Sequence, residues 1–249
     1  MALFQPPPLT RYDLTFSVAG IPVRVHPAFW LVAALLGGSG NTFLGLLIWV
    51  FVVFVSILVH ELGHSLAMGS FGQPSYIVLY FGGGLAVRER SLWGDSVLGR
   101  RQNILVSLAG PFAGFLFAGL ITAAVAAAGG VTHISLLFGI IPIPQAFFPS
   151  GAKALNLLVF YSLSVNVFWG LFNLLPVFPL DGGQVARHVM TGIDPWDGYR
   201  NSLWISVVTG ALIAFVSLFL LKSVYIAFLF GFLAIQSYQS LQGQYGRGF

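Results

Sequence analysis

Long apolar runs dominate the chain, and their lengths indicate which elements to expect. A helix rises 1.5 Å per residue, so about 20 apolar residues are needed to cross the roughly 30 Å hydrocarbon core of a bilayer. Candidate runs, separated by Gly, Pro, Asn or charged residues, are 27–38, 43–71, 102–128, 154–175, 201–221 and 224–241. The pattern predicts about six transmembrane helices, of which the first is short for a full span.

Two segments alternate in the manner of β-strands instead. Residues 15–27 alternate around a central Ala-Gly, and residues 75–90 have two β-rich arms around Gly82, Gly83 and Gly84. Open backbone cannot face lipid, so such a hairpin must be covered by protein, line a watery cavity or receive another strand. We therefore predict a small membrane-associated sheet, with ordinary interfacial loops as the alternative. Segment 131–151 is apolar but broken by prolines, and we expect it on the outer membrane face.

Composition supports the membrane class. The chain is 57% hydrophobic and 7% charged, with a mean hydropathy of +0.89, which leaves too little polar surface to cover a soluble globule. The fold class we predict is a polytopic, all-α membrane protein with a small β-hairpin or sheet. We expect no removable signal peptide, because the N-terminus has no apolar core or cleavage site. The absence of cysteine means that any metal site must use His, Asp or Glu.

The basic residues are distributed unevenly between the two sides that the six spans define. One side receives only Lys153 and Lys222. The other side receives Arg11, Arg24, Arg88, Arg90, Arg100, Arg101, Arg187, Arg200 and Arg247. The positive-inside rule makes the arginine-rich side cytoplasmic, together with both termini. Because these cations are scattered between apolar segments and form no basic stripe, we expect no nucleic-acid partner.

Three ionisable side chains lie inside the second apolar run, where charge is costly. They are His60, Glu61 and His64, in the sequence HELGH. Positions i and i+4 share one face of a helix, so both imidazoles can bind one zinc ion while the intervening glutamate reaches a water molecule. The spacing favours a zinc site with one Zn²⁺ per chain over a buried polar cluster.

A third protein ligand is expected from the segment NLLPVFPLDGG, residues 173–183. Asp181 is the other acid next to an apolar run, and we expect the two prolines and Gly182-Gly183 to place it on an irregular turn. A capping aspartate at a plain helix end is the alternative. Between the two motifs, Gly110, Gly114 and Ala118 recur at intervals of four and predict a helix face for close packing.

The motifs HELGH and NLLPVFPLDGG, with SLAGPFAGF at 107–115 between them, resemble those of the site-2 protease family of intramembrane zinc metalloproteases. The resemblance covers residues 15–190. It implies that His60, His64 and Asp181 hold zinc and that Glu61 is the catalytic acid and base. It also implies that Asn173 contacts substrate, and the membrane-associated sheet of the family would place Gly82, Gly83 and Gly84 at the substrate.

The resemblance also implies a function. We expect a single transmembrane protease domain over 1–249, with two additional helices at 201–241, in a bacterial plasma membrane. Its substrates would be single-pass membrane proteins, cut within or near the transmembrane segment to release a regulatory fragment or clear remnant peptides. An ion transporter and a non-catalytic, zinc-binding protein that holds clients are the alternatives. The oligomeric state stays open.

Overall fold

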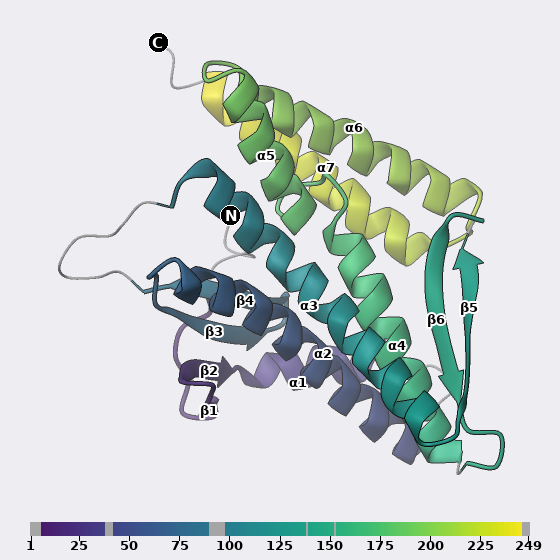
Figure 1. Ribbon diagram of the computed structural model, residues 1–249. Helices are drawn as coiled ribbons and strands as arrows, with labels where there is room; N and C mark the ends of the chain where they lie inside the picture. The colour runs from purple at the N-terminus through teal and green to yellow at the C-terminus, as the bar shows by residue number, and fades with distance from the viewer. Residues whose placement is uncertain (1–5, 38–41, 90–97, 138, 152, 246–249) are drawn as a thin grey trace. The chain divides into compact units, whose positions relative to one another are not determined.

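The computed structural model describes residues 6–37, 42–89, 98–137, 139–151 and 153–245 (Figure 1). Its internal contacts divide the chain into two compact units. The first combines Met1–Val97 with Ala109–Gly170, and the second combines Leu98–Leu108 with Leu171–Phe249. Arg90 and Arg247, used above to predict topology, lie outside the described residues. A single protease domain over the whole chain stays a prediction.

The first unit contains a four-stranded sheet in the order β1-β2-β3-β4. Its strands are β1 (Leu14–Val18), β2 (Ile21–Val25), β3 (Ser75–Tyr80) and β4 (Gly83–Arg88). Ala19 and Gly20 both have positive φ, at 51° and 79°, which is the tight turn that a two-residue hairpin requires. The β2–β3 pair is parallel, and the two hairpins are antiparallel. Both predicted strand segments are therefore confirmed.

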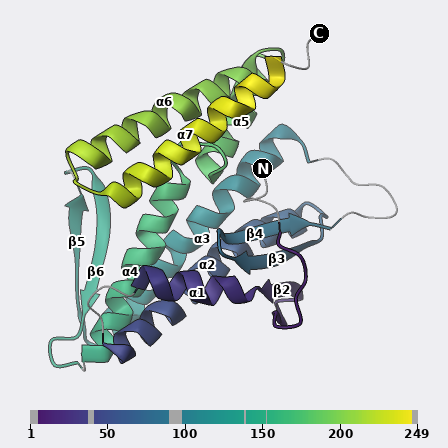
Figure 2. The same ribbon diagram turned by 180° about the vertical axis from the view of Figure 1, so that it is seen from behind.

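One face of the sheet forms the core of the first unit together with two helices. Helix α1 (Pro27–Gly37) follows β2 directly, and helix α2 (Phe43–Ser70) comes next in the chain (Figure 2). The buried cluster consists of Val23, Val25, Phe29, Ala33, Val53, Ile57, Ile77 and Leu79. This packing holds the sheet against the half of α2 that leads to the HELGH motif.

Five helices of the described chain are long and apolar enough to cross a membrane. They are α2, α3 (Arg100–Ala127), α4 (Lys153–Asn173), α6 (Gly198–Phe219) and α7 (Val224–Tyr245). Helix α1 has 11 residues, about 16 Å at 1.5 Å per residue, and is too short for a full span. The predicted class of a polytopic helical protein with a small sheet is confirmed. Helix α1 corresponds to the first apolar run, which the sequence analysis found short for a full span.

Two elements were not expected. Segment 131–151, which the sequence analysis described only as apolar and broken by prolines, forms a hairpin of β5 (Val131–Leu137) and β6 (Ile141–Phe147). In the second unit, a further helix, α5 (Asp181–Ile193), follows the aspartate motif. Helices α5, α6 and α7 of that unit pack together, and Val177, Phe230 and Leu233 form its buried core.

Candidate metal centre

Helix α2 places its two histidines one turn apart on the same face. His60 and His64 are 3% and 8% exposed, and their Nε2 atoms lie 3.2 Å apart. Two nitrogen ligands at about 2.0–2.1 Å from one tetrahedral zinc ion are about 3.3 Å from each other. The spacing of the two imidazoles therefore fits a pair of zinc ligands.

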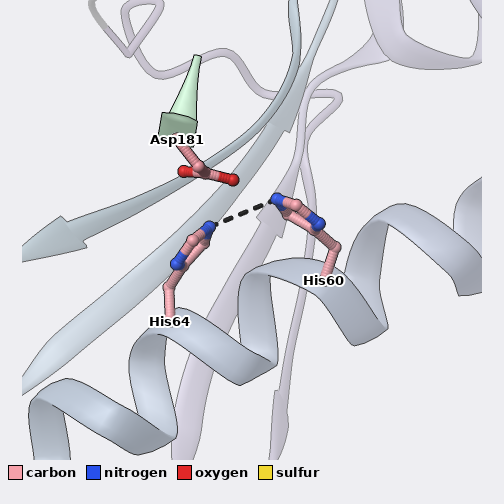
Figure 3. Close-up of side chains that lie close together, drawn as sticks. All are labelled: His60, His64 and Asp181. Carbon is pink, nitrogen blue, oxygen red and sulfur yellow. Dashed lines mark hydrogen bonds between the residues drawn. The ribbon is translucent and has the colours of Figure 1, made fainter. Parts of the chain in front are cut away.

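Asp181 supplies the third ligand atom. His60, His64 and Asp181 each offer one ligand atom, and these atoms all lie within 4.8 Å of one another. Figure 3 shows the Asp181 carboxylate facing the two imidazoles. Two imidazoles and one carboxylate are the protein ligands of many catalytic zinc sites, which leave the fourth position open. The structure thus brings together the three ligands predicted from sequence, in a donor set that fits zinc.

Glu61 is buried, at 5% exposure, and lies against strand β4. A Cβ atom built at Gly84 would be 2.5 Å from both Cγ and Oε1 of Glu61, closer than real Cβ atoms approach. Only glycine therefore fits at this position of β4, beside the carboxylate. The contact of Gly84 with substrate stays a prediction, and the structure shows a separate reason for glycine here, namely the space that Glu61 occupies.

Gly110 of α3 has the same role beside the histidines. A Cβ at Gly110 would be 2.5 Å from Cε1 of His64 and 2.8 Å from Nε2 of His60. By contrast, a Cβ at Gly114, one turn further along α3, would meet only ordinary contacts of 3.4 Å and beyond. The predicted small-residue face is present, but its first member borders the metal ligands and was not recognised from sequence as part of the site.

The other two glycines of the β3–β4 turn serve different purposes. Gly83 has φ of 107°, which side chains rarely adopt, and a Cβ there would lie 3.4 Å from the Trp169 ring. A Cβ at Gly82 would be 2.9–3.0 Å from the ring of Tyr80. Both positions therefore require a small residue for local reasons. Their predicted contact with substrate stays a prediction.

Two aromatic residues beside the site were missed by the sequence analysis. Trp169 of α4 presents its ring edge-on to His60, with the ring centroids 6.4 Å apart. Tyr80 is 2% exposed; burial raises the pKa of its hydroxyl, and the negative charge of Glu61 raises it further. The Tyr80 phenol is therefore protonated at neutral pH. Nothing in the local sequence distinguishes these two from ordinary core aromatics.

A buried amide connects α4 to α2 one turn before His60. Asn166 is 2% exposed, and its side-chain amide donates to Ser56 Oγ and to the Ser162 carbonyl, at 2.9 and 2.8 Å. Ser56 precedes His60 by four residues and therefore shares its face of α2. In an apolar interior this polar pair fixes the axial register of the two helices.

The backbone around Asp181 differs from the irregular turn that we predicted. Asp181 is the first residue of α5, and Gly182 and Gly183 belong to the first turn of that helix. A Cβ at Gly183 would be 2.5 Å from the backbone of Val177 and Phe178. The glycine pair thus allows α5 to pack against the preceding segment. Asn173 ends α4 and is half-buried, and its contact with substrate stays a prediction.

Comparison with known proteins agrees with this donor set. The model of the family described as Peptidase family M50 matches residues 48–217, which include all three candidate ligands. The chain belongs to this family. The match confirms the resemblance to the site-2 protease family, and the three candidate ligands are a donor set that suits zinc.

Individual members are similar over most of this chain. The chain is 28% identical over 208 residues to "Zinc metalloprotease MJ0392" of Methanocaldococcus jannaschii, covering 82% of this chain and 52% of that one. It is 29% identical over 206 residues to "Stage IV sporulation protein FB" of Bacillus subtilis, with coverage of 79% and 59%. The chain therefore spans about half the length of the curated relatives that it matches.

A solved structure shows the same fold. The "Site-2 Protease from Methanocaldococcus jannaschii" superposes with a TM-score of 0.55 at 25% identity. The superposition covers 92% of this chain and 95% of that one. The chain therefore shares the fold of this solved site-2 protease.

Proposed function

We propose that this M50 family protein hydrolyses peptide bonds within or near the transmembrane segment of single-pass membrane proteins. The observation that supports it is the group of His60, His64 and Asp181, whose ligand atoms lie within 4.8 Å, with two of the three ligands buried in an apolar helix. Zinc bound by such a set supplies a Lewis acid that acts on water and on a peptide carbonyl. An ion path would not require this spacing.

Glu61 is the residue to which we assign proton transfer. It follows His60 on α2, so its carboxylate is on the same part of the helix as the ligands. There it can accept a proton from water and return it to the leaving nitrogen, the role of a general base that later acts as an acid. The contact with Gly84 restricts the carboxylate on the side of the sheet. We assign Asn173 to a hydrogen bond with the substrate backbone.

Strand β4 is the element that we propose to hold the substrate backbone. In the described sheet β4 pairs with β3 and ends the strand order, so its other edge is available. The amide of Glu89 donates to the Pro74 carbonyl, at 2.9 Å, which fixes which residues of the strand face β3. Residues that bond to the partner strand alternate with residues that point away from it in an antiparallel ladder. The backbone N–H and C=O groups of Gly84, Ala86 and Arg88 therefore point to the other edge of β4.

An extended substrate added to that edge would lie about 4.8 Å from β4. Its peptide group opposite Gly84 would be beside Glu61, so we place the bond that is cut at this register. Pairing with β4 also replaces the hydrogen bonds that a substrate helix loses when it unwinds in the membrane. Substrates with helix-breaking residues are therefore preferred.

We also propose the orientation in the membrane. The excess of arginine on one side assigns that side to the cytoplasm of a bacterial cell. We assign both termini to it, although the short α1 is not one of the five long spans, because β2 pairs with β3 and so keeps the N-terminal strands at the end of α2 that carries β3. Fusion of a reporter that is active only in the cytoplasm to residue 249 tests this assignment. An inactive reporter at that position would contradict it.

The deciding experiment compares wild type with Glu61→Gln on a model membrane substrate that contains a helix-breaking residue. We expect both proteins to bind one zinc ion per chain, measured by mass spectrometry of the metal, and only wild type to cleave. Asp197→Asn, which removes an exposed carboxylate outside both motifs, is the matched control. Equal cleavage by Glu61→Gln would exclude hydrolysis at this site. Zinc binding and substrate capture without cleavage by wild type would indicate a protein that only holds clients.

A second variant tests the strand register. Ala86→Pro removes one outward N–H of β4 and leaves the bonds to β3 intact, whereas Ala86→Ser keeps that N–H. We expect Ala86→Pro to cleave more slowly at unchanged zinc content and Ala86→Ser to behave as wild type. Unchanged cleavage by Ala86→Pro would remove β4 from substrate binding.

A further inference from the structure

The proposed peptidase function assigns no role to the β5–β6 hairpin of the first unit. It begins four residues after α3 ends and finishes six residues before α4 begins. The amide of Gly130 donates to the Val125 carbonyl, at 2.9 Å, which ties the start of β5 to α3. Asn156 of α4 exchanges two side-chain hydrogen bonds with the backbone of Phe148, at 2.8 and 2.9 Å. Both ends of the hairpin are thus held at the ends of two membrane-spanning helices.

The composition of the hairpin is unlike that of a strand pair exposed to water. No Asp, Glu, Lys or Arg occurs between Arg101 and Lys153 in the sequence. Large apolar side chains are nevertheless exposed, namely Ile134 at 69%, Leu136 at 60% and Ile140 at 78%. Strand pairs that face water normally carry charged residues, which prevent association through the edges. The exposed surface of this hairpin therefore suits an apolar medium better than water.

The register separates the hairpin into two faces. Ile134 pairs with Pro144 and Leu136 pairs with Pro142, so these four side chains share one apolar face. His133 pairs with Gln145 on the opposite face, and Gln145 donates to Ser135 Oγ at 2.9 Å. The polar side chains thus gather in the middle of one face, and the other face has none at these positions.

The free edge of β6 is also adapted to lipid. Proline cannot donate to the ladder and in sheets is confined to edge positions, so we assign the backbone nitrogens of Pro142 and Pro144 to the edge of β6 remote from β5. Two of the outward N–H groups of this edge are therefore absent, and an unsatisfied N–H is what makes an open edge costly in apolar surroundings. The same two prolines make β6 a poor template for strand addition, in contrast to β4.

From these observations we infer that the β5–β6 hairpin inserts its Ile134/Leu136 face into the membrane as an interfacial anchor. Arg100 and Arg101 begin α3, and the hairpin follows its other end. Because α3 crosses the membrane, the hairpin lies in the leaflet opposite these two arginines. This face contacts lipid at the boundary between headgroups and acyl chains, where amphipathic elements bury their apolar side about 5–10 Å deep. The inference does not depend on the peptidase activity.

The absence of native cysteine allows a direct test with single-cysteine variants. Ile134→Cys and Ile140→Cys, each labelled with an environment-sensitive fluorophore, are placed in nanodiscs that hold one chain and contain phosphatidylcholine brominated in the upper acyl chain. Gln145→Cys, exposed on the polar face, is the matched control. We expect bromine to quench the probes at 134 and 140 about twofold or more beyond the probe at 145. Zinc content and elution volume check that each variant is folded.

Three results would overturn the inference. Equal quenching at 134 and 145 would show that the hairpin has no preferred face toward lipid, and no quenching at 134 and 140 would place it in water. Oxidative cross-linking of Ile134→Cys between two chains in larger nanodiscs, without quenching in single-chain discs, would identify a second copy as the occupant. The Ile140 variant at the turn makes the result independent of any disturbance within strand β5.

Discussion

Gly110 of α3 lies directly against the imidazole of His64, so closely that α3 has no room there for any side chain. The same glycine borders Nε2 of His60. The backbone of one membrane helix thus forms a wall beside the ligand atoms of another. Because interiors are close-packed, this contact restricts both imidazoles to the orientation in which their Nε2 atoms converge.

Gly110→Ala is expected to weaken zinc binding. The added methyl group would force His64 away from its present position, and loss of support around ligands typically reduces metal affinity about 10- to 100-fold. Competitive titration with a fluorescent zinc chelator measures this affinity. Gly114→Ala, on the same helix with room for the methyl group, is expected to retain wild-type affinity. Equal affinity of the two variants would show that the wall is not needed.

Gly84→Ala is expected to abolish cleavage and leave zinc bound. The methyl group would overlap the side chain of Glu61, whereas the three nearest atoms include none of the metal ligands His60, His64 and Asp181. The proposed proton acceptor would therefore leave its position without loss of the metal. Steady-state cleavage and metal content are measured together, with Gly69→Ala, which adds a methyl group in open space, as control. An active Gly84→Ala protein would argue against the assignment of Glu61.

Removal of the metal is expected to lower thermal stability. Binding to the folded state alone stabilises by RT ln(1 + [L]/Kd), about 4 kcal/mol at a thousandfold excess over Kd. A chelator should therefore lower the melting temperature of wild type, and Asp181→Asn should melt near that lower value with or without chelator. Differential scanning fluorimetry in detergent gives both values. A chelator effect of the same size on Asp181→Asn would contradict the role of Asp181 as a ligand.

The N-terminal segment is expected to loosen in acid. Although burial raises the pKa of Asp13, hydrogen bonds from Thr10 and Arg24 and the positive charge of Arg24 outweigh it, and the pKa lies below its ordinary value of 3.8. The ion pair, at 2.9 Å, contributes stability above the unfolded pKa and loses it as pH falls through the folded value. Arg24 also donates to the Pro7 and Pro8 carbonyls.

Asp13→Asn therefore mimics low pH at neutral pH. We expect faster amide hydrogen exchange in residues 9–18 of this variant than of wild type at pH 7, and a smaller difference as the pH falls through the lowered pKa of Asp13. Asp197→Asn, which removes an exposed pair with Arg200, serves as control. A difference that stays constant with pH would rule out the ionised carboxylate as its cause.

The sequence predicted those features of the fold that depend on residues close together in the chain. Apolar length predicted α2, α3, α4, α6 and α7, because a membrane span is a local property of about 20 residues. The turn at Ala19 and Gly20 and the glycines after Tyr80 likewise predicted both hairpins of the sheet. For segment 131–151 the sequence analysis predicted no strands, because its prolines hid the alternation. In β6 they occupy alternate positions, where a strand edge tolerates them.

Two histidines four residues apart on a helix must share a face, so the sequence by itself determined two of the three metal ligands. It also proposed Asp181 as the third ligand, and it determined that the protein lies in a membrane, since apolar content does not depend on the fold. Only the tertiary structure decided that Gly110 and Gly84 enclose the site, that Trp169 and Tyr80 border it, and that Asn166 joins α4 to α2. These contacts join residues far apart in the chain, and distance in space between such residues is set by packing, which no local pattern records.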